Sequence, residues 1–435
     1  MEFKEALHWL YSFKKFGSKL GLERITLLME ELGNPQNELK IIHVTGTNGK
    51  GSVCKFIGSI LQNAGYNVGV YISPHLQRFS ERICINNREI SKKEIISLIE
   101  FIKPTIERMI SQEKQPTFFE IVTAIAFKYF HDCKVDFAVI EVGLGGRFDA
   151  TNVVTPILSI ITNISLEHTN CLGEDTQSIA YEKAGIVKDN TTVITAAKDK
   201  AREVIEKVAK EKKSPITIVT EKNWKRTSYN KTHQDFTISG KLKNYNVKTT
   251  QLGRYQGENI AISIIAVENL QMNGVYITDE NICEGIYSAF NPGRMEIVSE
   301  DPIILLDGAH NTNAIEMLKL TLEKDFSYKK LILILGILKD KNYKKMITSI
   351  APISDKIIFT KSNNIRACEP EVLLNVTEEI AYKNEVLTID SIPKTIDYAK
   401  TISNKDDIIC ISGSLFTVGE ARQYLISPDK EIVEC

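Results

Sequence analysis

The chain has 435 residues, of which 43% are hydrophobic and 25% are charged, and its formal net charge is -1. This length exceeds what a single hydrophobic core usually supports, so we expect two domains. The balanced charge gives no reason to expect a nucleic-acid partner, and no segment approaches the ~18 consecutive apolar residues of a membrane span. We therefore expect neither nucleic acid nor a membrane as a partner.

The cysteines and the N-terminal sequence indicate the compartment. Eight cysteines are scattered along the chain without a C-x-x-C pair, so we expect neither disulfides nor a cysteine zinc site. Residues 1–8 lack the continuous apolar stretch of a signal peptide. The sequence therefore predicts a reduced, cytoplasmic protein.

The first part of the chain predicts helices followed by alternating strands and helices. Helices are expected within the first forty residues and over 52–64, 118–130 and 257–270, and strands over 39–44, 68–72, 136–140 and 157–164. Near-continuous apolar strands that alternate with helices predict a parallel sheet covered on both faces. Residues 215–250 differ, because short runs of alternating polarity there predict a small antiparallel β element.

The pattern breaks at Asn291-Pro292-Gly293-Arg294, where we place the linker between domains 1–292 and 293–435. A second α/β set follows, with strands predicted over 303–306, 331–335, 356–359 and 407–411. The sequence therefore predicts two α/β domains.

The strongest local signal is the segment Thr45-Gly-Thr-Asn-Gly-Lys-Gly-Ser52, which lies between a predicted strand and a predicted helix. Backbone N–H groups of such a turn hold phosphate at a helix N-terminus, and Lys50 would reach the β and γ oxygens. The segment departs from the usual G-x-x-x-x-G-K-[ST], because Val44 holds the first glycine position and Gly51 the hydroxyl position. A glycine-rich turn that binds nothing is the alternative, and the flanking strand and helix favour phosphate binding.

Polar side chains follow three further strands of the predicted parallel sheet. They are Ser73 and His75 after strand 68–72, Glu141 after strand 136–140, and His168 after strand 157–164. Because the carboxyl ends of parallel strands line one crevice, we expect these side chains to lie near Lys50. A transferring phosphoryl group needs a divalent cation, so Glu141 is predicted to bind the metal. A single histidine in the position of His168 is more often a polar loop residue than a metal ligand.

Short motifs recur in a fixed order from the first helix to about residue 420. They span residues 20–25, 43–52, 73–76, 81–82, 141–152, 168, 182–186, 292–296, 307–311 and 412–415. Their residues resemble those of the folylpolyglutamate synthase/dihydrofolate synthase family, the folate branch of the Mur ligase superfamily. The resemblance implies an α/β fold with a P-loop, Mur-ligase-like central domain built on a parallel sheet and a smaller, Rossmann-like α/β C-terminal domain.

The resemblance implies an ATP-dependent amide ligase that adds L-glutamate to dihydropteroate, to reduced folates or to both, through an acyl phosphate. We favour a bifunctional enzyme; a folylpolyglutamate synthase alone, or a related Mur-type amino-acid ligase, is the alternative. The implied cofactors are ATP and Mg²⁺, with a monovalent cation as a further candidate. The implied partners are small-molecule substrates, a pterin or folate acid and L-glutamate, and the protein is expected to be a monomer.

The resemblance also implies which residues act. Nucleotide contacts are implied for Thr47, Asn48, Gly49, Lys50, Gly51, Ser52, Asn259, Arg294, Asp307 and His310. Magnesium ligands are implied at Ser73, Glu141 and His168, and at Lys183 if that lysine is carbamylated. The implied catalytic residues are Lys50, Glu141, His168 and Lys183.

Several roles stay open at the level of sequence. For Lys183, the alternative is a surface lysine on a helix over 178–186. For Asp307 and His310, the alternative is a simple Asx turn after a strand. The run 339–341, Lys-Asp-Lys, is interpreted as a solvated charge run on a loop, although relatives carry similar residues near the glutamate site.

The pterin side would be lined by segments 20–25, 73–82 and 116–120. Phe118 or Phe119 could stack on the pterin ring, although core packing explains them equally well. Tyr255 stands where many relatives carry histidine, so the resemblance does not imply the contact made there.

Three other functions are weighed. A cell-wall Mur ligase would share the loop and the metal residues, but segments 21–24 and 73–75 are of the folate type. A P-loop GTPase or ATPase switch would leave the second α/β domain unexplained. A nucleotide-binding module without catalysis would leave the metal-site residues unexplained.

Overall fold

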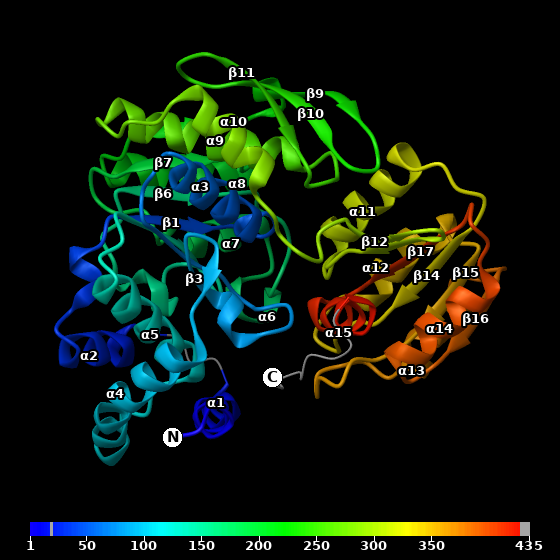
Figure 1. The fold of residues 1–435 in the computed structure, drawn as a ribbon, viewed down its shortest axis with the longest axis horizontal. Coiled ribbons are helices and arrows are strands. Elements are labelled where there is room, and N and C mark those ends of the chain that lie inside the picture. The colour runs from blue at the N-terminus through cyan, green and yellow to red at the C-terminus, as the bar shows by residue number, and fades with distance from the viewer. Residues whose placement is uncertain (18–20, 427–435) are drawn as a thin grey trace.

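The computed structural model describes residues 1–17 and 21–426 (Figure 1). Leu20, the first residue of segment 20–25, and the part of the predicted C-terminal domain from residue 427 onward lie outside the described residues. In the part of the chain that is described, no helix combines the length and the apolar character that crossing a membrane requires.

An eight-stranded sheet, in the order β4-β3-β2-β5-β1-β6-β7-β8, lies at the centre of the first part of the chain. Its strands are β1 Ile41–Thr45, β2 Val68–Tyr71, β3 Ile83–Ile85, β4 Arg88–Glu89, β5 Phe137–Glu141, β6 Leu158–Ile161, β7 Thr192–Thr195 and β8 Ile216–Ile218. The strands from β2 to β8 in this order are parallel, and β3 and β4 extend the sheet antiparallel. The predicted parallel sheet is confirmed.

Helices cover both faces of this sheet, which is why β1 and β5 are buried along their whole length. One face is covered by α3 Lys50–Asn63, α9 Gln256–Met272 and α10 Asp279–Ser288. The other is covered by α1 Phe3–Tyr11, α2 Glu23–Glu31, α4 Lys92–Ser111, α5 Phe118–Asp132, α7 Thr176–Ala184 and α8 Asp199–Glu211. Alternate residues of each strand enter the two cores, so Ile41 and Ile42 pack against different helices.

The prediction for residues 215–250 is partly wrong. β8 belongs to the large sheet, where it pairs parallel with β7. The small antiparallel sheet starts only at β9 Trp224–Tyr229 and continues through β10 Gln234–Ser239 and β11 Asn244–Thr249. The three-residue strand β8 is too short for its periodicity to show which sheet it joins.

A six-stranded sheet, in the order β12-β13-β17-β14-β15-β16, organises the second part of the chain. Its strands are β12 Glu296–Glu300, β13 Ile303–Leu306, β14 Leu331–Leu335, β15 Lys356–Phe359, β16 Glu385–Thr388 and β17 Ile408–Ser412. All are parallel except β12. One face carries α11 Thr312–Asp325, α12 Tyr343–Ile350 and α13 Pro370–Glu379, and the other α14 Ile392–Ile402 and α15 Leu415–Ile426.

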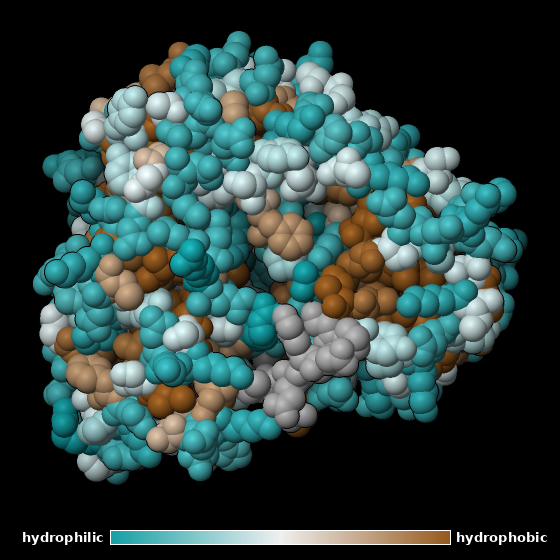
Figure 2. Space-filling view, in the orientation of Figure 1, coloured by the Kyte–Doolittle hydropathy of each residue, from teal (hydrophilic) through white to brown (hydrophobic). Residues whose placement is uncertain are grey.

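We call the large and small sheets with their helices the N-terminal lobe, and the six-stranded sheet with its helices the C-terminal lobe. The segment 291–294 connects α10 of the first lobe to β12 of the second. The two lobes lie beside each other, blue to green and yellow to red in Figure 1. Figure 2 shows the surface hollowed between them. Residues that follow β1, β2, β5 and β6 line the cavity there. The domain boundary at residues 292 and 293 stays a prediction.

Candidate active site

A cavity of about 1570 Å³ lies between the two lobes. Because β2, β5, β1 and β6 are adjacent and parallel, the segments that follow them open on one edge of the sheet. Most of the residues proposed from the sequence line this cavity: Thr47, Asn48, Gly49, Lys50, Gly51, Ser52, Ser73, Glu141, His168, Lys183, Asn259, Arg294, Asp307 and His310. His75 was also expected there, but it is buried outside the cavity and its Nδ1 accepts a hydrogen bond from Arg82 Nε at 2.7 Å. Their individual roles stay predictions.

The loop between β1 and α3 has a backbone that suits phosphate. Gly49 adopts left-handed backbone, with φ +86°, and a Cβ there would collide with the Asn259 side chain. The first N–H groups of a helix have no partner within the helix, and the residues at the start of α3 line the cavity. The Lys50 ammonium donates to the carbonyl oxygens of Gly46 (3.0 Å) and Thr47 (3.2 Å), so it lies against the loop.

Glu141 ends β5 as a buried carboxylate beside this loop. One of its oxygens accepts the Ser73 N–H at 2.9 Å, and a Cβ on Gly51 would lie 3.6 Å from the same oxygen. Burial raises the pKa of Glu141, while the Lys50 ammonium opposes that rise. A cation bound at this carboxylate would therefore stabilise the anionic form of Glu141, which burial disfavours.

Lys183 lies on α7 and is buried, so the alternative of a surface lysine is wrong. Its ammonium donates to the Gly46 carbonyl oxygen at 2.7 Å, next to the contact that Lys50 makes with the same atom. Burial, and secondarily the charge of Lys50, lowers the pKa of Lys183 to about 7. The amine is therefore substantially neutral near neutral pH.

His168 follows β6 and caps the short helix α6 Thr169–Leu172 with left-handed backbone, φ 50°. Burial lowers its pKa to about 4, so the imidazole is neutral at physiological pH and has a lone pair for a metal. Its Nε2 lies 3.6 Å from an oxygen of Glu167, a residue that the sequence analysis did not single out.

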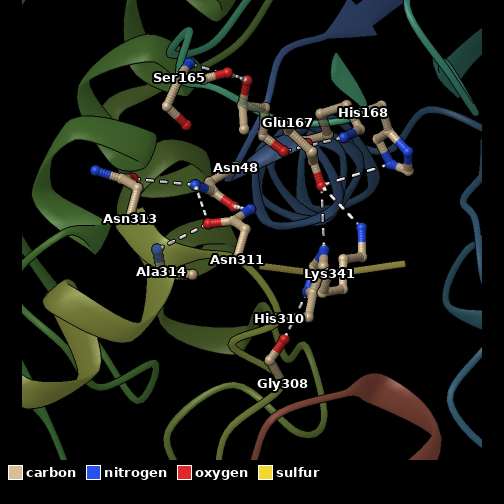
Figure 3. Close-up of polar contacts among 12 residues, drawn as sticks. Asn48, Ser165, Glu167, His168, Gly308, His310, Asn311, Asn313, Ala314 and Lys341 are labelled. Carbon is tan, nitrogen blue, oxygen red and sulfur yellow. Dashed lines mark hydrogen bonds and ion pairs between the residues drawn. The ribbon is translucent and has the colours of Figure 1, made fainter. Parts of the chain in front are cut away.

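Glu167 joins the two lobes (Figure 3). The oxygen near His168 is also 3.5 Å from His310 Nε2 and 3.7 Å from Lys341 Nζ, both from the C-terminal lobe. Although burial alone would raise the pKa of Glu167, His310 and nearby lysines hold it well below its usual range. The Lys341 side chain is only 10% exposed, so the interpretation of 339–341 as a solvated charge run is wrong for this lysine.

Two asparagines of the C-terminal lobe meet the phosphate-binding loop. The amide of Asn48 donates to Asn313 Oδ1 at 3.1 Å, and the amide of Asn311 donates to Asn48 Oδ1 at 3.0 Å (Figure 3). Asn311 also caps α11 by accepting the Ala314 N–H. The motif 307–311 contained Asn311, but nothing in the sequence showed that this asparagine would reach the other lobe.

Asp307 forms the Asx turn that was the alternative to a nucleotide-binding role. It accepts the N–H of Ala309 at 2.9 Å and of Met295 at 3.0 Å, and burial raises its pKa. Arg294 donates to the Gly308 carbonyl oxygen at 3.0 Å, and its charge opposes the rise in the pKa of Asp307. Both side chains still line the cavity, so a turn-forming role and a nucleotide-binding role are compatible here.

The aromatic residues beyond the loop have partners within the protein. Phe118 stacks on Tyr11 with ring centroids 5.5 Å apart, and Phe119 stacks on Tyr71 at 6.1 Å. Both phenylalanines are half-buried and pack against the core. The Arg82 guanidinium also lies 5.5 Å from the Phe118 ring. A pterin contact at these rings stays a prediction.

The predicted metal ligands do not form a cage. Within residues 1–17 and 21–426, no group of three or more His, Cys, Asp or Glu side chains is arranged to hold a metal. Magnesium usually keeps several waters and binds through one or two carboxylates together with substrate phosphates. The residues present, with Glu141 beside the phosphate-binding loop, fit such a shared site.

Comparison with known proteins covers both lobes. The Mur ligase middle domain matches residues 44–267, and the Mur ligase glutamate ligase domain matches residues 293–415. Dihydrofolate synthase/folylpolyglutamate synthase of Bacillus subtilis is 38% identical over 432 residues, which cover 97% of this chain and 99% of that protein.

Two solved structures have the same fold over nearly the whole chain. Mycobacterium tuberculosis folylpolyglutamate synthase, solved with ADP, is 28% identical with a TM-score of 0.91, and the match covers 99% of this chain and 100% of that one. Escherichia coli FolC, solved with DHPP and ADP, is 29% identical with a TM-score of 0.85, and the match covers 98% of each chain. This chain belongs to the dihydrofolate synthase/folylpolyglutamate synthase family of Mur ligases.

Proposed function

We propose that this protein is an ATP-dependent ligase that joins L-glutamate to a pterin or folate carboxylic acid. The observation that carries the proposal is the single cavity in which the phosphate-binding loop and Glu141 of one lobe face His310 and Lys341 of the other. This arrangement, in a chain of this family, suits a reaction in which ATP activates a carboxylate for attack by an amine.

The chemistry follows from the weak electrophilicity of a carboxylate. An oxygen of the substrate carboxylate attacks the γ-phosphorus of ATP, the bond to ADP breaks, and an acyl phosphate forms. The amine of glutamate then attacks the acyl carbon, loses a proton and expels phosphate, which leaves an amide. Lys50 and the loop N–H groups stabilise charge on the transferring phosphoryl group, and the opposed lobes limit the access of water to the acyl phosphate.

We propose that Mg²⁺ is held by Glu141, Ser73 and His168 together with the phosphates of ATP. The ion would supply charge neutralisation at the phosphoryl group. In support, Glu141 lines the same cavity as the phosphate-binding loop, and burial lowers the pKa of His168 to about 4, which leaves its imidazole neutral. A bound monovalent cation stays a candidate from the family resemblance.

Lys183 is proposed to act as a carbamate. Its neutral amine would attack carbon dioxide, form an N–C bond and release one proton, which leaves an oxygen-rich anion. A lysine ammonium beside magnesium would repel the ion, whereas a carbamate suits it. The lowered pKa of Lys183, to about 7, supports this step because it provides the unprotonated nucleophile.

The acceptor is proposed to be both dihydropteroate and reduced folates, with folylpolyglutamate synthase activity alone as the alternative. The half-buried rings of Phe118 and Tyr11 and the guanidinium of Arg82 gather beside segment 73–82. Flat aromatic and cationic surfaces of this kind can accept a pterin ring.

The oligomeric state, the domain bounds and the cellular location of the enzyme are also proposals. We propose a monomer with domains 1–292 and 293–435, whose boundary falls in the segment that connects α10 to β12. A cytoplasmic location agrees with the cysteines that the structure describes, all of which are free thiols.

The experiment is phosphate release from ATP and Mg²⁺ with dihydropteroate or tetrahydrofolate, each with and without glutamate. We expect release that needs both a pterin acid and glutamate, and with both acceptors if the enzyme is bifunctional. Equal release without any pterin acid would refute the ligase in favour of a simple ATPase. Release with tetrahydrofolate alone would leave the folylpolyglutamate synthase alternative.

A further inference from the structure

Glu167 is a buried carboxylate at the point where the two lobes meet. It lies between β6 and α6 of the N-terminal lobe, and its side chain is 7% exposed. One of its oxygens is approached by His168 of its own lobe at 3.6 Å and, from the C-terminal lobe, by His310 at 3.5 Å and Lys341 at 3.7 Å (Figure 3). An anion of one lobe is therefore surrounded by basic groups, two of which come from the other lobe.

The segment that carries Glu167 is tied to the phosphate-binding loop. The Thr47 hydroxyl donates to the Ser165 carbonyl oxygen at 3.2 Å and accepts the Ser165 N–H at 3.1 Å. Two contacts to one hydroxyl hold the start of this segment at a set distance from the loop. The Glu167 carboxylate therefore has a defined place relative to the site of phosphoryl transfer.

The groups that meet Glu167 are oriented on the other side as well. His310 Nδ1 lies 2.8 Å from the Gly308 carbonyl oxygen, which leaves Nε2 to face Glu167. Lys341 lies three residues after Leu338, which forms a β-bridge with Ala367, and its backbone N–H donates to the Leu338 carbonyl oxygen at 3.1 Å. Its ammonium reaches from the C-terminal lobe to an acid of the N-terminal lobe, so its position depends on how the lobes meet.

We infer that Glu167 is a positioning residue for ligation: its carboxylate draws His310 and Lys341 of the C-terminal lobe to the sheet edge that carries the phosphate-binding loop and His168. The inference rests on the proposed function, because it concerns the step in which the lobes come together around ATP and the acyl phosphate. Glu167 itself is not assigned a contact with substrate or with metal. Its effect passes through the two basic groups that it holds.

The physical reason is the charge balance at this edge. Lys50 and Lys341 both line a cavity that would hold the phosphates of ATP. Like charges disfavour one another's approach, and a buried carboxylate between them offsets that repulsion while the lobes close. Without the carboxylate, Lys341 would lose the partner that keeps its ammonium at the edge.

The test is Glu167→Gln, which keeps the shape of the side chain and removes its charge. We expect kcat for glutamate ligation to fall at least about 10-fold, with the affinity for ADP alone and the Mg²⁺ requirement each within about 3-fold of the wild type. Small-angle scattering with ADP should show a larger radius of gyration than for the wild type. Lys341→Gln should lower kcat similarly, and the double variant should be little worse than either single variant.

Glu268→Gln is the matched control. Glu268 is a fully buried carboxylate of the same lobe that accepts N–H groups of Lys241 and Leu242, and it does not line the cavity. Its loss should lower the free energy of unfolding but leave kcat of the folded enzyme within about 2-fold. A kcat that falls equally in both variants would indicate a purely structural role and overturn the inference.

Other outcomes would also overturn it. They are unchanged kcat and radius of gyration in Glu167→Gln, a Mg²⁺ requirement or ADP affinity altered at least about 10-fold, or fully multiplicative effects in the double variant. Failure of the proposed function looks different, because the wild type would then lack pterin- and glutamate-dependent phosphate release. In that event the scattering comparison still decides whether Glu167 holds the lobes together.

Discussion

Lys50 is the residue whose loss should separate catalysis from stability most clearly. Its ammonium donates to the carbonyl oxygens of Gly46 and Thr47, and it lines the cavity rather than the core. We expect Lys50→Ala to reduce kcat by about 100-fold or more, because a charge at a transferring phosphoryl group is worth several kcal/mol. The free energy of unfolding should change by less than about 1 kcal/mol.

Steady-state phosphate release and urea unfolding measure the two quantities for Lys50→Ala. Lys210→Ala, an exposed lysine on α8, is the control and should change neither. If Lys50→Ala retained more than about a tenth of the wild-type kcat, the loop lysine would not hold the transferring phosphoryl group.

Lys183 gives a prediction that depends on pH. Its amine has a pKa lowered from 10.5 to about 7, so the unprotonated form that can capture carbon dioxide increases as the pH rises through about 7. In ¹³C-bicarbonate, the protein should give a carbamate signal that grows over this interval and is absent from Lys183→Ala. Lys183→Ala should be nearly inactive and partly rescued by a short carboxylic acid. An unchanged carbamate signal in Lys183→Ala would exclude this lysine.

The same shift sets the sign of a stability effect. The unfolded chain keeps the Lys183 proton up to about pH 10.5, whereas the folded chain releases it near 7. Between these values the unfolded state binds more protons, so this group contributes stability that increases with pH. Carbamate formation would add to the effect, because it stabilises the folded state by mass action.

The residues of the loop and the strand-end residues Ser73, Glu141 and His168 could be predicted from sequence, while Glu167 and Lys341 could not. The loop and Glu141 lie in motifs whose neighbouring strand and helix already fix their place. Glu167 and Lys341 lie on different lobes, and each is an ordinary charged loop residue until the two lobes meet. A sequence pattern describes local periodicity and does not show which distant loops will face each other.

The contact between α3 and α10 gives a prediction for packing between elements. A Cβ on Gly285 would lie 2.7 Å from the backbone nitrogen of Ile60 and even closer to its Cα, and backbone atoms of α3 cannot move aside easily. We expect Gly285→Ala to lower the free energy of unfolding by about 1–3 kcal/mol, as overpacking usually does. Chemical denaturation measures this.

Glu284→Ala, on the exposed side of the same helix, is the control for Gly285→Ala and should lie within about 0.5 kcal/mol of the wild type. Equal stability of the Gly285→Ala protein and the wild type would mean that α10 does not pack against α3 as closely as described.

The small antiparallel sheet holds the far end of α11. Arg226 on β9 forms two hydrogen bonds to Asp325 at the end of α11, and the Tyr229 hydroxyl donates to the Lys324 carbonyl oxygen at 2.9 Å. The start of α11 meets the phosphate-binding loop through Asn313. This helix of the C-terminal lobe is therefore attached at both ends to the N-terminal lobe.

Asp325→Asn should weaken that attachment, because it leaves the largely buried Arg226 guanidinium without its anion. We expect the KM for ATP to rise by about 3- to 10-fold with kcat less affected, since the reacting groups are unchanged. Initial-rate kinetics over a range of ATP concentrations measure the effect. Asp189→Asn, at an exposed acid of the N-terminal lobe, should have wild-type values. Unchanged KM in Asp325→Asn would show that this pair does not contribute to nucleotide binding.

Prediction of elements succeeded where apolar runs were long and continuous. The strands 303–306, 331–335 and 356–359 match β13, β14 and β15 residue for residue, because parallel strands buried on both faces have unmistakable apolar runs. The half-exposed strands β12 and β16 were not predicted, since neither is continuously apolar. Both lie at the edges of the sheet, where burial imposes the weakest pattern.

At the scale of the whole molecule, the lobes meet through contacts that surround the cavity. Gln77 accepts from Arg422 at 2.6 Å and donates to Gln423 at 3.0 Å on one side, and Arg226 pairs with Asp325 on another. Glu167 with Lys341 lies between the lobes, beside the proposed site of reaction. The two-domain organisation was expected from length and from the break near residue 292, whereas this set of contacts depends on tertiary structure alone.

The central claim is that the carboxylate of the acceptor attacks the γ-phosphorus of ATP before glutamate reacts. The most direct test uses dihydropteroate labelled with ¹⁸O in its carboxyl group, together with ATP, Mg²⁺ and glutamate, and mass analysis of the released phosphate. The mechanism transfers a carboxylate oxygen to phosphorus and then breaks the bond between that oxygen and the acyl carbon. We therefore predict a single ¹⁸O atom in each phosphate released, whereas unlabelled phosphate accompanying amide formation would contradict the account.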